Sequence, residues 1–294
     1  MSCPSVSIVT PSYNQRGFIE ETLDSISIQT YSDIQHIVID GGSTDGTRDV
    51  LEDQEGIDWI SEADEGQSDA INKGLDLADG DIIGWLNSDD VFFDIEVVER
   101  VVRYFDNSNT DVLYGDVALI GPDSTILSFQ IVPDFDYDRL LRGCFIEQPA
   151  VFFHADVLAD NRLNEMLDYV MDYELWLKLS QNYEFRHVAD VLAADRYHRE
   201  RKIIANRNDM QKETKEVQRQ YGNEHDLSYE IRQVADTVFD GIPRAIEAIY
   251  RGMRLRKDSR ELAFGGTFAP PHRLFMNSFQ LNKNLVPEVE DDHK

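Results

Sequence analysis

Short apolar runs alternate with amphipathic segments along the first hundred residues. The runs are rich in β-branched residues and predict strands over residues 6–10, 35–40, 57–61 and 81–86. The segments between them have a helical period and predict helices over residues 18–28, 47–53 and 68–78. Runs that are apolar almost throughout, such as SVSIVT and DIIGWL, are typical of strands with helices on both faces. The pattern therefore predicts an α/β fold with a Rossmann-like, mostly parallel sheet flanked by helices.

Polar loops follow the predicted strands, at residues 10–14, 40–46, 62–67 and 87–90. Turn chemistry alone accounts for Gly, Asp, Ser and Asn in any one of them. Ligands of open parallel sheets bind outside the carboxyl ends of the strands, so four such loops at one edge favour a binding site. The first strand is not followed by a GxGxxG motif, which disfavours a dinucleotide-binding oxidoreductase.

Two adjacent carboxylates, Asp89 and Asp90, follow the predicted strand 81–86. Their mutual repulsion is relieved by a divalent cation, and Mg²⁺ and Mn²⁺ commonly combine one or two carboxylates with phosphate oxygens of a substrate. The pair predicts a site for a metal and a diphosphate. The alternative is a helix start, because these residues and Asp94 precede the amphipathic segment 95–106.

The charge of the chain excludes some partners. Its 56 acidic and 28 basic residues give a net charge of -28, which repels nucleic acid, so no nucleic-acid partner is expected. The 35 Asp and 20 Arg, against 21 Glu and 8 Lys, are typical of a halophile's surface, although an ordinary acidic protein is the alternative. Cys3 and Cys144 have no metal-binding spacing, and no apolar run approaches the roughly 18 residues of a membrane span. We expect a cytoplasmic protein.

Several of these motifs, in this order, resemble the nucleotide-sugar half of family 2 glycosyltransferases, which have the GT-A fold. The resemblance rests on SIVTPSYNQRGFIEETLDSISIQTYSDIQHIVIDGGSTDGT and SEADEGQSDAINKGLDLADGDIIGWLNSDD, and it covers about residues 5–200. It implies a nucleotide site built from Thr10, Pro11, Tyr13, Asp40 at the uracil edge, and Asp64. It also implies that residues 87–90 are the DxD-type motif, in which Asp89 faces the donor ribose or sugar and Asp90 binds Mn²⁺ or Mg²⁺.

The resemblance extends to the second half of the predicted domain. Asp172 occupies the position of the family's general base, before a helix predicted within residues 167–179; a simple helix cap and Asp168 as the base are the alternatives. His198 matches a histidine that joins the metal shell in several relatives, against a surface histidine as the alternative. Glu147 and Gln148 match an acceptor-side strand, although Gln148 could instead satisfy backbone groups of a turn before the next proline.

After about residue 205 the resemblance fades, and helical segments are expected over 208–221 and 229–256. Residues 242–260 carry six basic and two acidic side chains together with regularly spaced apolar ones. A basic amphipathic helix is typical of a peripheral membrane contact, and packing on the catalytic domain is the alternative. The predicted organisation is a GT-A domain over 1–205, with a nucleotide-sugar half (1–106) and an acceptor half (107–205), then a helical extension (206–285) and a disordered tail (286–294).

These expectations combine into one function. The chain is expected to be a metal-dependent, inverting glycosyltransferase that moves a sugar, such as a hexose, from a nucleotide-diphospho-sugar such as UDP-hexose to a glycan or a lipid-linked acceptor, with Asp172 as the base. A sugar nucleotidyltransferase is one alternative, but it calls for a glycine-rich, basic loop after the first strand, which TPSYNQ lacks. A protein that binds a nucleotide-sugar without turnover is the other, and it has no need of the base.

Overall fold

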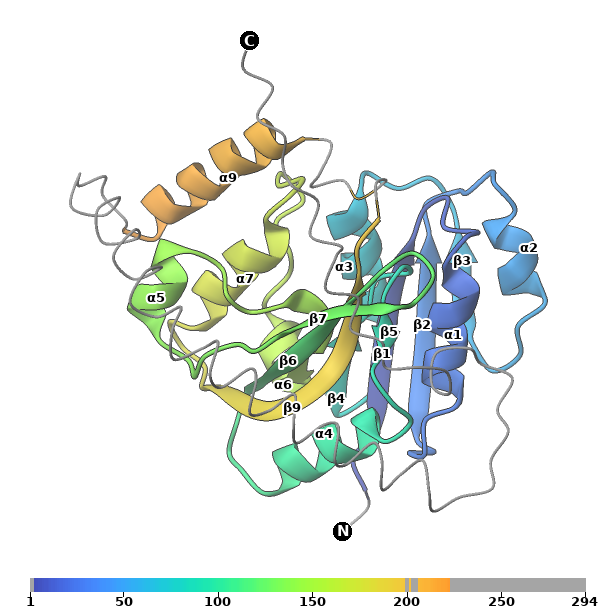
Figure 1. Cartoon of the computed structure of the whole chain (residues 1–294), viewed down its shortest axis with the longest axis horizontal. Coiled ribbons are helices and arrows are strands. Elements are labelled where there is room, and N and C mark those ends of the chain that lie inside the picture. The colour runs from blue at the N-terminus through green and yellow to red at the C-terminus, as the bar shows by residue number, and fades with distance from the viewer. Residues whose placement is uncertain (1–2, 199–200, 202–205, 223–294) are drawn as a thin grey trace.

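The structure is a computed structural model that describes residues 3–198, 201 and 206–222 (Figure 1). Its first half alternates strands and helices in the order that the apolar pattern predicts, with only small shifts at their ends. These elements are β1 (Val6–Ser12), α1 (Ile19–Ser27), β2 (Ile34–Asp40), α2 (Thr47–Glu52), β3 (Asp58–Ser61), α3 (Gln67–Leu77), β4 (Ile82–Trp85), β5 (Val91–Phe92) and α4 (Val97–Asp106).

The second half is more irregular. Its elements are β6 (Val112–Ile120), β7 (Ile126–Gln130), α5 (Tyr137–Arg142), the short 3₁₀ helix η1 (Gln148–Ala150), β8 (Val151–His154), α6 (Ala155–Ala159), α7 (Met171–Leu179), β9 (Phe185–Arg196) and α9 (Arg207–Gln220). The helix expected within residues 167–179 begins at Met171. The strand before His198 is the end of the longer β9.

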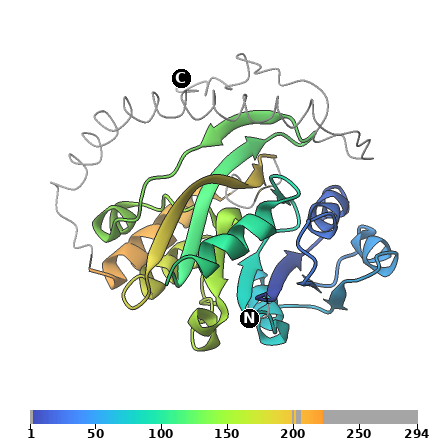
Figure 2. The ribbon, with the colours of Figure 1, turned by 90° about the horizontal axis from the view of Figure 1, so that it is seen from below.

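One sheet runs through the described part of the chain, in the order β3-β2-β1-β4-β8-β6-β9-β5, with β7 beside β6. The strands from β3 to β4 are all parallel, as the apolar runs predict. β8 is inserted antiparallel between β4 and β6, and β9 runs parallel to β6. Figure 2 shows these strands as one curved layer with helices against it. The predicted α/β class is confirmed.

Apolar residues of β1 alternate between the two faces of the sheet. Ile8 packs with Val97 and Val101 of α4 on one face, and Val9 packs with Ile71 of α3 on the other. A β-carbon on Gly74 of α3 would lie 2.3 Å from a methyl carbon of Val9, so the glycine lets α3 approach β1 closely. The helix layers bury the middle of the sheet and leave its carboxyl edge to the polar loops.

The helix α9 packs on the acceptor half rather than standing apart from it. Val217 of α9 belongs to the same apolar cluster as Trp176 of α7. The carboxylate of Glu213 accepts hydrogen bonds from the backbone N–H groups of Asp168 and Tyr169, at 3.0 and 2.8 Å. Figure 1 shows α9 lying along α7 and α5. The first described helix of the predicted extension is thus continuous with the core of the domain.

The boundary expected at residue 205 stays a prediction, because most of the extension lies outside the described residues. The same holds for the helix expected over 229–256, the basic segment 242–260 and the tail 286–294. Every helix in the described ranges is too short or too polar to cross a membrane.

Candidate active site

The loops after β1 and β2 are tied together by hydrogen bonds. The backbone N–H of Asn14 donates to Ser43 Oγ at 2.7 Å, and the N–H of Thr44 donates to Asn14 Oδ1 at 2.9 Å. Asn14 has φ 52°, a left-handed conformation that asparagine tolerates better than most residues. These contacts join the loops after β1 and β2, which together are called the rim below. The family resemblance implies that both loops contact the nucleotide.

The residues expected to line the nucleotide site differ in how far they reach it. Thr10 is buried, and its Oγ1 lies 3.0 Å from His36 Nε2. Burial lowers the pKa of His36 to about 3, so this ring is neutral. Pro11 is also buried, whereas Tyr13 is 62% exposed. Thr10 and Pro11 are therefore buried under the loops of the rim. The ring of Tyr13, in contrast, is accessible to a base or a sugar.

Asp40, at the end of β2, is fully buried. Its carboxylate accepts hydrogen bonds from the backbone N–H of Ser43 at 2.9 Å and from the hydroxyl of Ser61 at 2.6 Å, and a further one from the Ser43 hydroxyl. Asp40 thereby fixes the loop after β2 against the end of β3. Its position under the rim suits a residue that shapes the nucleotide site through its neighbours.

Asp64 follows β3 and turns toward the loop after β2. Its Oδ1 accepts the backbone N–H of Gly66 at 3.0 Å. A β-carbon on Gly41 would lie 2.5 Å from Asp64 Oδ2, so any other residue at position 41 would displace the Asp64 carboxylate from the loop after β2. The structure therefore brings Asp40 and Asp64 to one edge, as the motif order implies.

Asp90 lies inside the protein, with 3% of its surface exposed. Its Oδ1 accepts the backbone N–H of Arg196 at 2.9 Å, and its carbonyl accepts the Thr22 hydroxyl at 2.7 Å. Burial, together with the nearby charges of Asp89 and Asp195, raises the pKa of Asp90 well above its ordinary value. This carboxyl joins the loop after β4 to β9.

Asp89 faces the other way, toward the end of β9. Its Oδ2 lies 2.9 Å from Nε2 of His198, and the two side chains are 19% and 5% exposed. The ring atom Nδ1 of His198 is buried and has no hydrogen-bond partner among the described residues. The contact joins the ends of β4 and β9, two strands that are far apart in the sequence.

A divalent cation fits this pair of residues. One carboxylate and one imidazole are suitable donors for Mn²⁺, and Asp89 Oδ2 and His198 Nε2, 2.9 Å apart, are close enough to be ligands of one cation. The described residues contain no group of three acidic, His or Cys side chains that could hold a metal by themselves. Two protein donors suffice where diphosphate oxygens and water complete the coordination, as is usual for Mg²⁺.

Gln148, predicted on the acceptor side, is engaged by groups at the end of β4. It is buried; its side-chain N–H₂ donates to the carbonyl of Trp85 at 2.6 Å, and its Oε1 accepts from the amide of Asn87 at 2.9 Å. Asn87 Oδ1 in turn accepts from Gln67 and from the Trp85 indole, both at 2.9 Å. Gln148 thus satisfies backbone and side-chain groups of the loop after β4, which agrees in part with the alternative drawn from the sequence.

Acidic side chains continue from the Asp89 loop to the acceptor half. Burial, followed by the charges of Asp195 and Asp172, raises the pKa of Glu147 to about 7. Asp195 also lies within the electrostatic influence of Asp89. The carboxyl of Glu147 is thus influenced by the charges of Asp195, near the Asp89 loop, and of Asp172 on α7. Arg201 offsets part of this charge through an ion pair with Asp195 at 2.8 Å.

Asp172 stands in the first turn of α7, one residue after its start. Its Oδ1 accepts the backbone N–H of Tyr173 at 2.7 Å. Burial raises the pKa of Asp172 to about 6. The residue before α7 is Val170, so Asp172 is not the cap of this helix, and Asp168 lies exposed in the preceding loop.

Of the three aspartates in the helix-start alternative, Asp94 is the one that contacts the start of α4. Asp94 Oδ1 accepts the backbone N–H of Glu96 at 2.8 Å, directly before α4. Asp89 and Asp90 take no part in that start.

Sequence reasoning missed Arg196, which is wholly buried beside the Asp89 loop. The position of Arg196, two residues before His198 in the sequence, was the available signal. It also passed over Asn87, the centre of the amide network, because an asparagine in a turn is unremarkable by itself.

Comparison with known proteins agrees with this geometry. Solved structures with the GT-A fold resemble the chain at 20% identity. Staphylococcus aureus TarS 1–349 in complex with UDP-GlcNAc has a TM-score of 0.57 over 69% of this chain and 61% of its own. The mannosyltransferase PcManGT from Pyrobaculum calidifontis, in complex with GDP-Man and Mn²⁺, has a TM-score of 0.52 over 68% and 59%. The fold is that of GT-A glycosyltransferases.

Residues 7–165 match the sequence model of glycosyl transferase family 2, and the chain belongs to this family. A glycosyltransferase of Rickettsia felis, described as uncharacterized, is 30% identical over 70% of this chain and 37% of its own length. A PGL/p-HBAD biosynthesis glycosyltransferase of Mycobacterium tuberculosis is 33% identical over 52% of this chain and 60% of its own. The chain spans little more than a third of the first of these relatives. Neither organism supports the expectation of a halophilic origin.

Proposed function

We propose that the chain is an inverting glycosyltransferase with a UDP-sugar, such as a UDP-hexose, as donor and a divalent cation at the diphosphate. The observation that carries the proposal is the 2.9 Å contact between Asp89 and His198 at the carboxyl edge of the sheet, in a chain of family 2. The UDP-GlcNAc bound to TarS and the Mn²⁺ and GDP-Man bound to PcManGT support it by similarity of fold.

In this proposal Asp89 and His198 hold the cation, and Asp90 keeps the loop in place from inside. The assignment differs from the sequence-based expectation, which gave Asp90 the cation and Asp89 the donor sugar. It rests on the burial of Asp90 and its hydrogen bond to the Arg196 backbone. When bound, Mn²⁺ or Mg²⁺ supplies positive charge that stabilises the departing diphosphate. The rim around Tyr13, Asp40 and Asp64 receives the nucleotide.

Asp172 is the proposed base on the acceptor side. Its carboxylate takes the proton of the acceptor hydroxyl as that oxygen forms a bond to the anomeric carbon. The bond from this carbon to the diphosphate oxygen breaks on the opposite face, which inverts the anomeric configuration. In this proposal Glu147 hydrogen-bonds the acceptor, and its pKa of about 7 lets it donate as well as accept near neutral pH.

We further propose a glycan or lipid-linked acceptor at the cytoplasmic face of a membrane. The support is the composition of residues 242–260, in which six basic and two acidic side chains accompany apolar ones. This part of the proposal is separate from the donor chemistry.

The function is tested by incubating the purified full chain with Mn²⁺ and a panel of UDP-, GDP- and dTDP-sugars, and measuring release of nucleoside diphosphate. UDP release from at least one UDP-sugar, raised by an acceptor and abolished by EDTA, is expected. Release of UDP that persists in EDTA would contradict the cation. A lack of release from every donor, in a protein that still binds UDP, would favour the binding protein without turnover.

The two aspartates give the cation assignment a matched pair of variants. Asp89→Asn is expected to weaken Mn²⁺ binding in the presence of UDP and to abolish transfer. Asp90→Asn keeps an oxygen that can accept the Arg196 N–H, so Mn²⁺ binding is expected to persist. Electron paramagnetic resonance of Mn²⁺ measures both affinities. Loss of Mn²⁺ binding in a folded Asp90→Asn variant, with normal binding by Asp89→Asn, would return the cation to Asp90.

A further inference from the structure

The side chain of Arg196 lies wholly inside the protein, at the end of β9. Its Nε donates to the backbone carbonyl of Asp89 at 2.7 Å, and one terminal nitrogen donates to Glu21 Oε2 at 2.8 Å. The other terminal nitrogen donates to Ser124 Oγ at 2.7 Å and approaches two carbonyls of the β6–β7 turn, those of Gly121 and Pro122. A buried guanidinium is costly unless it is paired, and here protein groups pair it.

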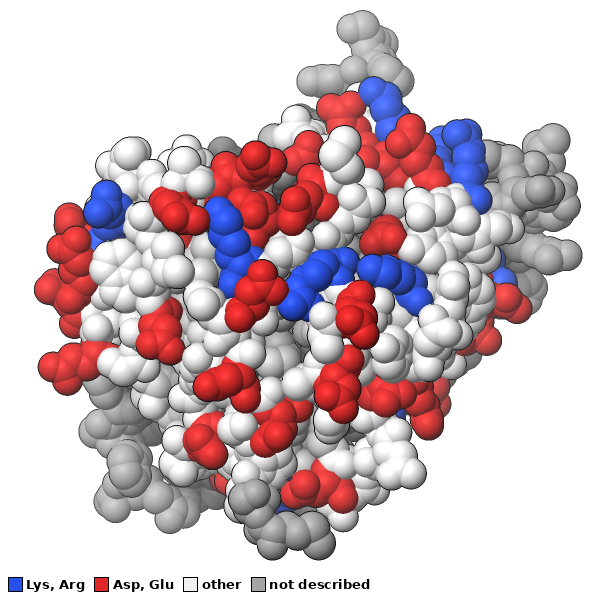
Figure 3. Space-filling model, turned by 180° about the vertical axis from the view of Figure 1, so that it is seen from behind, with Lys and Arg blue, Asp and Glu red and all other residues white. Residues whose placement is uncertain are grey.

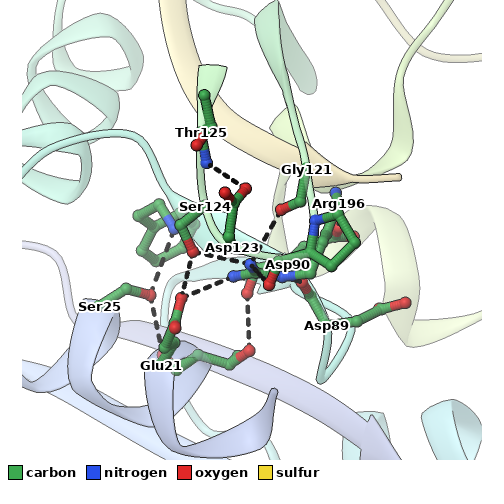
Figure 4. Close-up of polar contacts among 12 residues, drawn as sticks. Glu21, Ser25, Asp89, Asp90, Gly121, Asp123, Ser124, Thr125 and Arg196 are labelled. Atoms are coloured by element: carbon green, nitrogen blue, oxygen red, sulfur yellow. Dashed lines mark hydrogen bonds and ion pairs between the residues drawn. The ribbon is translucent and has the colours of Figure 1, made fainter. Parts of the chain in front are cut away.

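Arg196 therefore joins segments that are distant in the chain. Figure 4 shows the guanidinium between Glu21 of α1, the turn around Ser124, and the Asp89–Asp90 loop. Glu21 also accepts a hydrogen bond from the Ser124 hydroxyl at 2.6 Å, so the three side chains close a ring of contacts. The β6–β7 turn and α1 are thereby fixed against the loop after β4.

The contacts hold the loop by its backbone. Arg196 binds the carbonyl of Asp89 with its side chain and the carboxylate of Asp90 with its backbone N–H. Thr22 of α1 donates to the carbonyl of Asp90 at 2.7 Å. With these groups engaged, the Asp89 carboxylate is directed to His198.

Arg196 also acts on His198, through an aromatic ring. The Phe18 ring centroid lies 5.1 Å from the guanidinium carbon of Arg196 and 4.6 Å from the centroid of the His198 ring. One phenyl ring thus contacts both the buried cation and the imidazole. Such contacts restrict the orientation of the imidazole as well as its position.

We propose that Arg196 is a positioning residue for the cation site, setting Asp89 through its backbone and His198 through Phe18. The inference rests on the proposed cation role of Asp89 and His198. Partners in the second layer around a metal orient its ligands, and their loss typically weakens metal affinity about 10- to 100-fold.

The test compares two variants with a control in the full chain. Arg196→Lys keeps the charge but loses the planar fork, and Phe18→Leu removes the ring without leaving a buried charge. Arg100→Lys is the control, because Arg100 is also largely buried and bridges Asp94 at 2.8 Å and Asp190 of β9, away from Asp89. Mn²⁺ affinity in the presence of UDP is measured by electron paramagnetic resonance, and folding by circular dichroism and thermal unfolding.

Arg196→Lys and Phe18→Leu are expected to bind Mn²⁺ about 10- to 100-fold more weakly, and Arg100→Lys as the wild type does. If Arg196→Lys fails to fold, the Mn²⁺ affinity of Phe18→Leu alone tests the inference. Wild-type Mn²⁺ affinity in the folded variants, or an equal loss in Arg100→Lys, would overturn the inference and leave the proposed function standing. A wild-type protein that binds UDP but no Mn²⁺ would overturn the cation role and the inference together.

Discussion

Asp172 combines a position at the start of α7 with a carboxyl whose pKa burial raises to about 6. A general base works in its deprotonated form, so the transfer rate should rise with pH through about 6 and level off above it. Asp172→Asn should remove this dependence and lower the rate about 10²- to 10⁴-fold, with UDP binding retained. The measurement is the pH profile of UDP release with saturating donor.

Two further variants control this assignment. Asp168→Asn changes an exposed carboxyl four positions earlier and should keep wild-type activity. Glu147→Gln removes the group with a pKa of about 7 and should leave the rise near pH 6 in place. An inactive Asp168→Asn beside an active Asp172→Asn would show that the base was chosen wrongly.

The position after a predicted strand was sufficient to single out the Asp89–Asp90 pair, because hard cations require oxygen ligands such as carboxylates. His198 and Asp172 were proposed from the family resemblance. The orientation of each side chain was not available. Whether Asp89 or Asp90 turns inward depends on the partner that reaches it, and that partner is the backbone of Arg196, 106 positions later. The same holds for Gln148, whose partners are the carbonyl of Trp85 at the end of β4 and the amide of Asn87 in the loop after it.

At the scale of elements, the connection between α9 and α7 predicts a distant effect on the base. Glu213 holds the two backbone N–H groups that precede Asp172 by a few residues. Glu213→Gln leaves one carbonyl oxygen in place of two carboxylate oxygens, and hydrogen bonds to charged groups contribute about 1.5–3 kcal/mol each. We expect a lower melting temperature and a kcat that falls more than the donor KM rises.

Glu216→Gln is the matched control, since Glu216 is exposed on the same helix. It loses an equal charge at a position where no contact to the loop before α7 is found among the described residues. Steady-state kinetics and thermal unfolding are measured for both variants and compared with the wild type. Equal effects of the two substitutions would remove the special role of Glu213.

Most of the parallel half of the sheet could be predicted from sequence, because β1 and β4 are covered on both faces and are nearly continuous in apolar residues. The second half could not. β8 enters antiparallel between β4 and β6, and this order is determined by long-range pairing that leaves no local pattern. β7 is another example, since its residues are partly exposed and have little apolar periodicity.

At the scale of the whole molecule, acidic side chains dominate. Figure 3 shows them distributed over the face seen from behind, with fewer basic side chains among them. With a net charge of -28, the folded chain repels itself, and salt screens this repulsion as the Debye length falls to about 3 Å at 1 M. The melting temperature should therefore rise with KCl, by about 2–4 °C for each kcal/mol of repulsion removed.

Calorimetry across a KCl series measures the melting temperature. How the melting temperature depends on KCl concentration distinguishes screening of charge repulsion from other effects of salt. Stabilisation by screening approaches saturation near molar salt. Stabilisation by exclusion of a salt from the protein surface keeps increasing with concentration, and sulfate at matched ionic strength measures that contribution. A melting temperature that is constant or falls in KCl would mean that the acidic surface is already balanced by local ion pairs.

The late position of β9 in the chain has a consequence for synthesis. Asp90 leaves the ribosome 106 residues before Arg196, and at about 5–20 residues per second this interval lasts roughly 5–20 s. During this interval Asp89 and Asp90 lack the strand that orients them. That strand is β9, which pairs with β5 and brings His198 to Asp89. Under the proposed function, the residues assigned to the nucleotide are all synthesised well before the pair assigned to the cation is complete. Nucleotide recognition and cation binding would then be acquired at different moments of translation.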